Sequence, residues 1–353
     1  MTKESFMEML ETYMTSHSES ELSEKMTIEK AVAFWRLAVW FSKNSSKELA
    51  AEKIGKIHDL FLKCAEKDHK YYFWSAECSM LMDMNFKSNS PFERTVGEYE
   101  QFSKNCRKIR FRDVTGKDKM NKNFIMLKYG MDDLWEQEWG GIFCNVHIYT
   151  RYMMYHCYDK MGDRFFRDGL KNNDNDSLCE AFDCYIEAVK CLKFLESNGK
   201  LAQNDTFFFN EFHFLCSLTY GKLLEVSYFI EETETAQMCF NTLLSKKCYL
   251  SDKYYKYMFR LFVREGRPDR AEDSLKLGYM KKLDVIKSYK QNINCRNDVL
   301  KKYKHELREF VSLINRYFGK TELQILEDIF FTTNKKTERV FFGDADMTEV
   351  VGI

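Results

Sequence analysis

The segment that decides the predicted fold is Tyr254–Lys282, YYKYMFRLFVREGRPDRAEDSLKLGYMKK. Its first half places large apolar residues at i, i+3, i+4 and i+7, the spacing of one buried helix face: Tyr255, Met258, Phe259 and Phe262. Gly266 can take the left-handed conformation that ends a helix, and Pro268 suits the first turn of the next one. The segment therefore predicts two antiparallel helices joined by a short turn.

Helical spacing recurs along most of the chain. Residues 1–26 are acidic and predict a short helix through Phe6 and Leu10, followed by a solvated Ser/Glu connection. Apolar stripes then predict helices over residues 27–43, 45–64, 70–84, 92–106, 142–170, 178–198, 206–230, 233–246 and 297–318. Alternating patterns typical of strands are absent, so the sequence predicts an all-α protein.

Capping residues predict where several helices begin and end. Ser45, Ser177 and Thr321 are each followed three residues later by Glu or Gln, the spacing of a capping box. Ser90 and Pro91 predict a helix start at the proline, and Gly319 predicts the end of the helix that precedes it. The predicted divisions are an acidic N-terminal segment (1–26), helical hairpins (27–109), a basic and Gly/Trp-containing irregular connection (110–141), helical repeats (142–331) and a C-terminal tail (332–353).

Composition indicates a folded chain in a reducing compartment. The sequence has only two prolines and equal numbers of basic and acidic residues, 54 of each. Most of the 12 cysteines lie inside helical apolar patterns, where a free thiol behaves as a small hydrophobic side chain. The longest apolar run, Ala31–Phe41, is too short to span a bilayer. We therefore expect a cytoplasmic or nuclear protein with no membrane partner.

Three predicted second helices share one spacing of small and large residues. The matches are Ala181-x3-Tyr185-x2-Ala188, Ala236-x3-Phe240-x2-Leu243 and Ala271-x3-Leu275-x2-Gly278. This spacing resembles the tetratricopeptide repeat, mainly over residues 178–283. The resemblance implies a right-handed stack of antiparallel helical hairpins, a TPR-like α-solenoid. Phe259 and Gly278 depart from the family's small residues, so we expect an irregular stack with splayed helices; another helical-hairpin solenoid or bundle is the alternative.

Candidate catalytic and metal sites fail on spacing. His305 and Glu306 begin a zinc-protease helix pattern, but Glu309 stands where that pattern needs histidine. Cys144, His147, His156 and Cys157 would be spread along one helix, too far apart to share a metal. No phosphate loop or nucleophile elbow is present. We therefore expect no enzyme activity, no cofactor and no metal.

Binding is the predicted function, and two surfaces are candidates. The first is a groove for a peptide or helix of a partner protein, which would make the chain an adaptor or scaffold within a larger complex. Its candidate residues are Lys256, Arg260, Arg264, Arg267, Arg270, Lys281 and Lys282. The alternative is an RNA- or DNA-binding protein that uses basic faces over residues 107–122 and 276–308. The residues in the first of these faces are Arg107, Lys108, Arg110, Arg112, Lys117, Lys119 and Lys122. The tail carries Phe341 and Phe342 and either docks on the last helices or acts as a linear motif.

Overall fold

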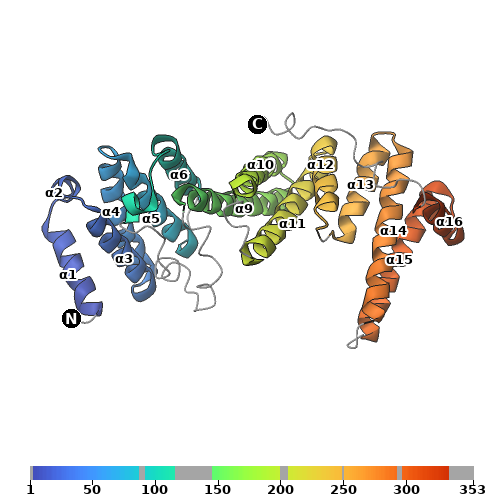
Figure 1. Cartoon of the computed structure of the whole chain (residues 1–353), viewed down its shortest axis with the longest axis horizontal. Helices are drawn as coiled ribbons and strands as arrows, with labels where there is room; N and C mark the ends of the chain where they lie inside the picture. The colour runs from blue at the N-terminus through green and yellow to red at the C-terminus, as the bar shows by residue number, and fades with distance from the viewer. Residues whose placement is uncertain are drawn as a thin grey trace. The chain divides into compact units, whose positions relative to one another are not determined.

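The computed structural model describes residues 3–86, 92–115, 145–198, 206–248, 250–291 and 296–333. Within these ranges the chain is helical and has no strand, and several pairs of helices that follow one another in sequence pack together (Figure 1). The predicted all-α class is therefore confirmed. Most of the predicted irregular connection and nearly all of the tail lie outside the described residues.

The chain divides into two compact units. The first unit contains Met1–Arg167 and Asp183–Phe212, and the second contains Asp168–Phe182 and His213–Ile353. Three helices, α9 (Val146–Asn172), α10 (Asn175–Asn198) and α11 (Thr206–Phe229), each contribute residues to both units. Each unit has its own buried apolar residues.

The first unit is organised around one enclosed helix, α5 (Tyr72–Asn85), in which every residue from Phe73 to Leu81 is buried. The ring of Trp74 lies between α3 and α4, with its centroid 6.1 Å from that of Trp35 and 6.2 Å from that of Phe61. The other helices that precede α9 are α1 (Lys3–Ser16), α2 (Glu19–Glu24), α3 (Ile28–Asn44), α4 (Lys47–Ala65), η1 (His69–Tyr71), α6 (Glu93–Asn105) and α7 (Phe111–Thr115). The predicted helix over 70–84 is thus the centre of this core.

Local capping explains where the first helices begin, with two corrections. Thr27 caps α3, since its hydroxyl accepts a hydrogen bond from the backbone N–H of Lys30. The cap of α4 is Ser46, and not the predicted Ser45, which instead ends α3. The prediction of a solvated connection after residue 16 was wrong, because Ser18 forms a capping box that starts α2.

Two further starts also differ from the prediction. Helix α10 begins before Ser177, because the carboxylate of Asp174 accepts hydrogen bonds from the backbone N–H of Asp176 and from the Ser177 hydroxyl. Helix α6 begins at Glu93, after Phe92 in the left-handed conformation (φ 72°), and not at the predicted proline. Residues 90 and 91 lie outside the described ranges.

The second unit confirms the predicted hairpin. Its helices after α10 are α11 (Thr206–Phe229), α12 (Thr233–Ser245), α13 (Asp252–Arg264), α14 (Pro268–Lys290), α15 (Asn297–Phe318) and α16 (Glu322–Thr333). Helices α13 and α14 pack together, with Gly266 at φ +68° in the turn and Pro268 in the first turn of α14. Gly319 ends α15 at φ +67°, and Thr321 with Gln324 forms the predicted capping box of α16.

The prediction that α13 and α14 splay was wrong. The Ser274 hydroxyl donates a hydrogen bond of 2.9 Å to the backbone carbonyl of Tyr255, which requires the two helices to be close. A Cβ on Gly278 would lie 3.0 Å from the Cβ of Tyr255 and 2.5 Å from Phe310 of α15. Gly278 therefore allows three helices to meet, while Phe259 packs against Tyr317 of α15.

Cysteines and helix hydropathy agree with the sequence reading as far as the structure describes them. The described cysteines are free thiols, and most are buried, including Cys64, Cys191 and Cys239. None of the helices in the described ranges is both long and apolar enough to cross a membrane.

Candidate functional site

Two of the predicted partner-binding cations lie along the contact between α13 and α11. Arg260 donates a hydrogen bond of 3.1 Å to the hydroxyl oxygen of Tyr228, and Arg264 pairs with Glu231 at 2.6 Å. The side chains of Arg264 and Glu231 are 52% and 64% exposed, so solvent screens this ion pair and it contributes little stability. Both arginines are therefore open to competition from an incoming anion.

Lys256 and Lys282 have a structural role instead. Lys256 pairs with Glu309 of α15 at 2.5 Å, and its ammonium lies over the ring of Phe310. Lys282 is only 7% exposed and pairs with Asp252 at 2.7 Å and Glu306 at 2.8 Å. These two lysines join α13, α14 and α15.

The environment of Lys282 favours its charged form. Burial by itself would lower the pKa of this ammonium, but hydrogen bonds to Asp252 and Glu306 outweigh burial and raise its pKa above the ordinary value. A cation that already has two carboxylate partners at this depth has little to offer a ligand. We therefore place Lys282 in the scaffold of the second unit.

The remaining predicted cations have different surroundings. Arg267 pairs with Glu265 at 3.1 Å, and Arg270 donates a hydrogen bond of 3.3 Å to the side-chain oxygen of Gln237 on α12. Lys281 is exposed and lines a groove. The seven residues thus do not share one surface.

The groove that Lys281 lines has a volume of about 750 Å³ and lies between the end of α12, the start of α13 and the second half of α14. We call it the α12–α14 groove. Its apolar and aromatic lining consists of Leu244, Cys248, Leu250, Tyr255, Val285 and Tyr289. Its charged lining consists of Lys247, Lys281 and Asp284. An apolar cleft with two cations and one anion suits an apolar segment that carries acidic side chains.

Comparisons of this chain with family models, curated proteins and solved structures found no match. The tetratricopeptide resemblance therefore rests on the residues alone, and the function must be argued from the chemistry of the surfaces. Among the described residues, no group of three or more His, Cys, Asp or Glu side chains could hold a metal ion.

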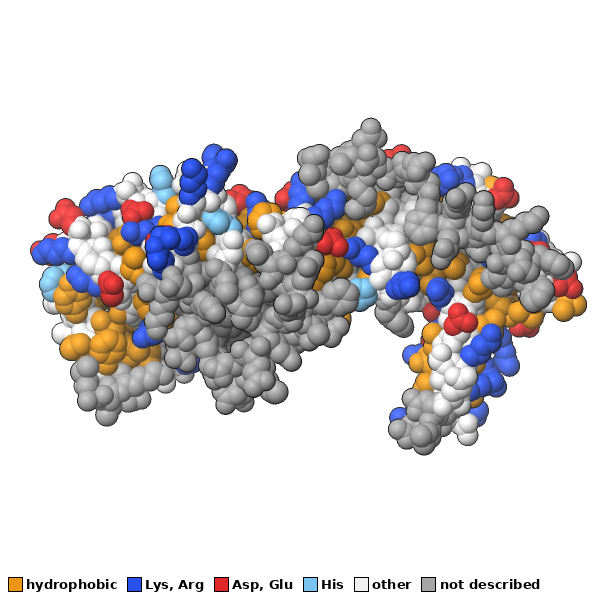
Figure 2. Space-filling model, viewed as in Figure 1, with side chains coloured by type: hydrophobic (Ala, Val, Ile, Leu, Met, Phe, Trp, Pro, Cys, Tyr) orange, Lys and Arg blue, Asp and Glu red, His pale blue; other side chains and the backbone are white. Residues whose placement is uncertain are grey.

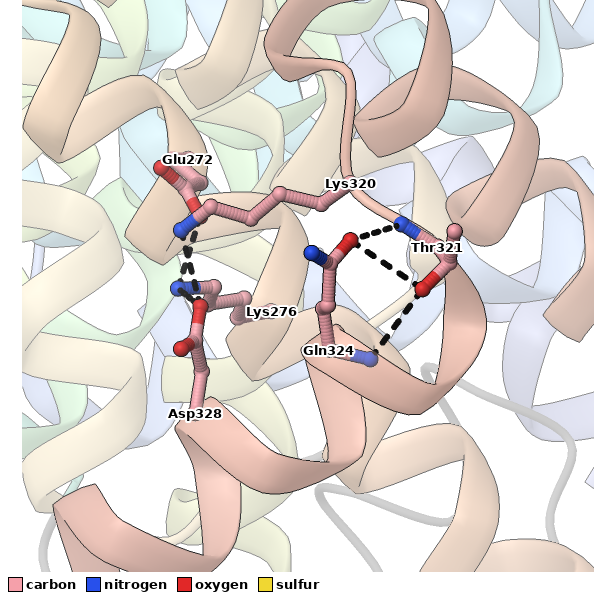
Figure 3. Close-up of polar contacts among 6 residues, drawn as sticks. All are labelled: Glu272, Lys276, Lys320, Thr321, Gln324 and Asp328. Atoms are coloured by element: carbon pink, nitrogen blue, oxygen red, sulfur yellow. Dashed lines mark hydrogen bonds and ion pairs between the residues drawn. The ribbon is translucent and has the colours of Figure 1, made fainter.

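Four charged side chains fasten α16 to α14 (Figure 3). Lys276 pairs with Glu272 and Asp328, each at 2.7 Å, and Lys320 pairs with the same two carboxylates at 2.5 and 2.8 Å. Hydrogen bonds from the two lysines hold the pKa of the Asp328 carboxyl below its ordinary value. The charges balance within this cluster, so Lys276 is not available to the predicted basic face 276–308.

The two predicted nucleic-acid faces differ in how many cations remain free. In the first, Arg110 and Arg112 lie 3.3 and 3.9 Å from the carboxylate of Asp113, and Lys117, Lys119 and Lys122 lie outside the described residues. In the second, the hairpin of α14 and α15 carries exposed cations on both helices (Figure 2). Arg107 and Lys108, which also belong to the first face, are exposed.

Sequence reasoning missed a buried polar network in the first unit. Glu77 of α5 is fully buried and accepts hydrogen bonds from the hydroxyls of Tyr99 at 2.5 Å and Tyr149 at 2.8 Å. Glu98 of α6 accepts from Ser79 at 3.1 Å. The sequence signal for this network is Glu77, a charged residue inside the otherwise apolar run around Trp74. A glutamate on a buried face needs polar partners.

Glu98 also pairs with a buried histidine. Its second oxygen lies 2.7 Å from Nε2 of His58 on α4, a residue that is 1% exposed. Burial alone would lower the pKa of His58, but the hydrogen bond and charge of Glu98 outweigh it and raise that pKa above 6.5. A cavity of about 380 Å³ lies alongside, with Ser79, Asp83 and Arg94 in its lining. The polar groups of this network satisfy one another, so we assign it to the stability of the first unit.

Proposed function

We propose that this chain is a non-enzymatic helical-repeat adaptor that binds a peptide or helix of a partner protein. The observation that carries the proposal is the α12–α14 groove, in which apolar side chains from three helices line one cavity. Recognition of a helix or peptide by an apolar groove needs anchoring side chains rather than reactive groups. We expect the partner segment to present apolar anchors flanked by acidic residues, which would face Lys247 and Lys281.

The architecture we propose for this adaptor is an irregular right-handed, TPR-like α-solenoid. Support comes from the antiparallel α13–α14 hairpin and from the alanine positions of the repeat, since Ala181, Ala236 and Ala271 are all fully buried. Stacked hairpins leave a continuous surface on which partners bind. A cytoplasmic or nuclear location follows from the free buried thiols and is part of the proposal.

A single substitution tests the groove. Val285 is 38% exposed in the lining, so Val285→Asp should leave folding intact while placing a charge against apolar anchors of the partner segment. We expect peptides selected from a displayed random library on the full chain to lose at least about tenfold in affinity for this variant, since a buried unpaired charge costs more than 1.4 kcal/mol. Equal affinity for both proteins would exclude the groove.

A matched control separates groove binding from a general loss of stability. Val263 on α13 is 42% exposed and does not line the groove, so Val263→Asp makes the same chemical change elsewhere on the second unit. We expect peptide affinity to be unchanged in this variant. Affinity purification from native extract then compares the full wild-type chain with Val285→Asp, with and without nuclease. It shows whether the proteins that only the wild type captures stay bound after nucleic acid is removed.

A further inference from the structure

A second surface of the same unit has a different character. The second half of α14 (residues 281–290) and the first half of α15 (residues 297–308) form a two-helix arm that extends past α13 (Figure 1). The helices are antiparallel, since Gly278 meets Phe310, Lys282 meets Glu306 and Tyr289 meets Tyr303. Residues 297–308, the part of α15 that belongs to the arm, include no buried residue, so most of the arm's surface is exposed.

Five cations gather on one side of this arm. We call the positions at which the two helices of the arm face each other the inward positions. They are Lys282, Ile286 and Tyr289 on α14 and Tyr303 and Leu307 on α15. Each residue along a helix is rotated by roughly 100° from the one before. Because the two helices are antiparallel, the residues that follow the inward positions point to the same side of the pair. These residues include Lys287, Lys290, Lys304 and Arg308, and Lys301 lies one turn before Lys304 on that side.

The cations of this side are not neutralised by the protein. Lys287, Lys290, Lys301, Lys304 and Arg308 are all exposed, and among the described residues none of them has an ion-pair partner. Two of the acidic residues of the arm are already paired, Asp298 with Arg296 and Glu306 with Lys282, and the third, Asp284, lines the α12–α14 groove. Blue side chains accordingly gather along the free end of this hairpin in Figure 2. We call these five residues the basic face of the arm.

We propose that the basic face of the arm binds the phosphate backbone of double-stranded nucleic acid. Exposed cations spaced a turn apart on two helices suit a regular row of phosphates, and binding of this kind gains its free energy from counterion release. The arm's tyrosines do not suit base stacking: Tyr289 and Tyr303 pack edge to face at 5.5 Å, and Lys282 lies over Tyr303. A surface with cations but no free aromatic ring favours duplexes over single strands.

This inference goes beyond the proposed adaptor function and does not depend on it. The residues of α14 that line the α12–α14 groove are Lys281, Asp284, Val285, Ser288 and Tyr289, and none of them belongs to the basic face. Three of them, Lys281, Val285 and Ser288, precede the inward positions and so lie on the other side of α14. A partner segment in the groove and a duplex on the basic face could therefore bind the same chain, and we expect substitutions on one side to leave binding at the other unchanged.

The test is a titration of the full chain against a labelled 20-base-pair duplex, in separate DNA and RNA arms. The wild-type affinity should fall on the order of 500-fold between 50 and 200 mM salt, since five phosphate contacts predict a slope near −4.5. Replacing all five residues of the basic face by Gln should weaken binding by at least about 100-fold at 50 mM salt and flatten this slope. A single strand of the same length should bind more weakly than the duplex.

A variant with matched charge controls for the loss of five positive charges. Lys43, Lys47, Arg167 and Lys171 are exposed on other helices, and Lys67 is exposed in the turn after α4. None of the five has an ion pair among the described residues, so replacing them by Gln makes the same change in net charge. This control should bind like the wild type. Circular dichroism should give the same helix content for all three proteins.

Three outcomes would overturn the proposal. They are no duplex binding at 50 mM salt, equal binding by the basic-face variant and the wild type, and binding of poly-glutamate as tight as that of the duplex. The last result would assign the face to an acidic protein segment instead. Loss of peptide binding in Val285→Asp with duplex binding intact would show that the two surfaces act separately.

Discussion

At the scale of single residues, Gly278 shows why a position must be judged by what its side chain would meet. The tetratricopeptide family has alanine here, and alanine favours a helix by about 1 kcal/mol over glycine. In this chain a Cβ would lie 2.5 Å from the ring of Phe310, a core residue that cannot move freely. We therefore expect Gly278→Ala to lower the free energy of unfolding by about 1–3 kcal/mol, measured by urea titration.

Gly55 is the matched control for this prediction. It lies inside α4, and a Cβ there would meet nothing within 4 Å. Gly55→Ala should raise the free energy of unfolding by about 0.5–1 kcal/mol, because only helix propensity changes. Stabilisation by both substitutions would contradict the close approach of α13, α14 and α15.

The His58–Glu98 pair predicts a second effect at this scale. Because burial lowers the pKa of His58 and Glu98 overcomes burial, Glu98→Gln should move that pKa from above 6.5 to below it. Asp59 raises and Arg94 lowers the same pKa, and neither changes in the variant. An NMR titration of the His58 ring measures the shift, with His147, whose pKa burial lowers, as an internal reference.

The same substitution should change stability in a pH-dependent way. A histidine with a raised folded pKa contributes stability below its unfolded pKa of 6.5, and this contribution is lost as the pH rises through the folded value. Glu98→Gln should therefore destabilise the protein more at about pH 6 than at about pH 9, by about 3 kcal/mol at the lower pH. An equal loss at both values would mean that His58 is neutral throughout.

At the scale of an element, α16 depends on four charges to hold its place. Among its described side chains, Leu323 and Leu326 are exposed and Ile325 is fully buried, so the first half of α16 has one apolar anchor. The ion pairs of Asp328 with Lys276 and Lys320 add a second attachment to α14 and the connection before α16. We expect Asp328→Asn to increase hydrogen exchange across α16 by about fivefold, the effect of about 1 kcal/mol.

The pH dependence of this effect follows from the lowered pKa of Asp328. A carboxyl of this kind contributes its full stability above its ordinary pKa of 3.8 and loses it as the pH falls through the lower folded value. Wild type and Asp328→Asn should therefore differ at neutral pH and become alike in strong acid. Glu327→Gln removes an exposed carboxylate on the same helix that has no ion pair within the described part of the chain, so this variant should change nothing.

At the scale of the whole molecule, two separate cores predict two unfolding steps. Cys64 and Cys191 are buried in the first unit, where burial raises their thiol pKa to about 11 and about 12, and Cys239 is buried in the second. Such thiols react only after their unit opens. Pulsed alkylation along a urea gradient should therefore label Cys64 and Cys191 at one urea midpoint and Cys239 at another.

Gly278→Ala identifies which step belongs to which unit. The substitution lies in the second unit, so it should shift the midpoint for Cys239 and leave that for Cys64 in place. Simultaneous reaction of all three thiols in both proteins would show that the two units unfold as one.

Features that depend on near neighbours could be read from the sequence. Gly266, Pro268 and Gly319 act through their own backbone conformations, so the α13–α14 turn and the end of α15 were predicted correctly. The apolar stripes predicted most helix bounds within a few residues for the same reason. The cap of α4 was predicted one residue too early, because Ser45 and Ser46 both have suitable side chains and only Ser46 takes the cap position.

The roles of the charged residues were decided by tertiary structure. Lys256 pairs with Glu309 and Lys282 with Glu306, partners 53 and 24 residues away in the chain, so no local pattern could show that these cations are neutralised. The closeness of Gly278 to Phe310 has the same origin. The sequence determined by itself that the chain is helical and where its main hairpin turns, because helix formation is local. Which cations remain free, and where a groove opens, depended on how distant helices pack.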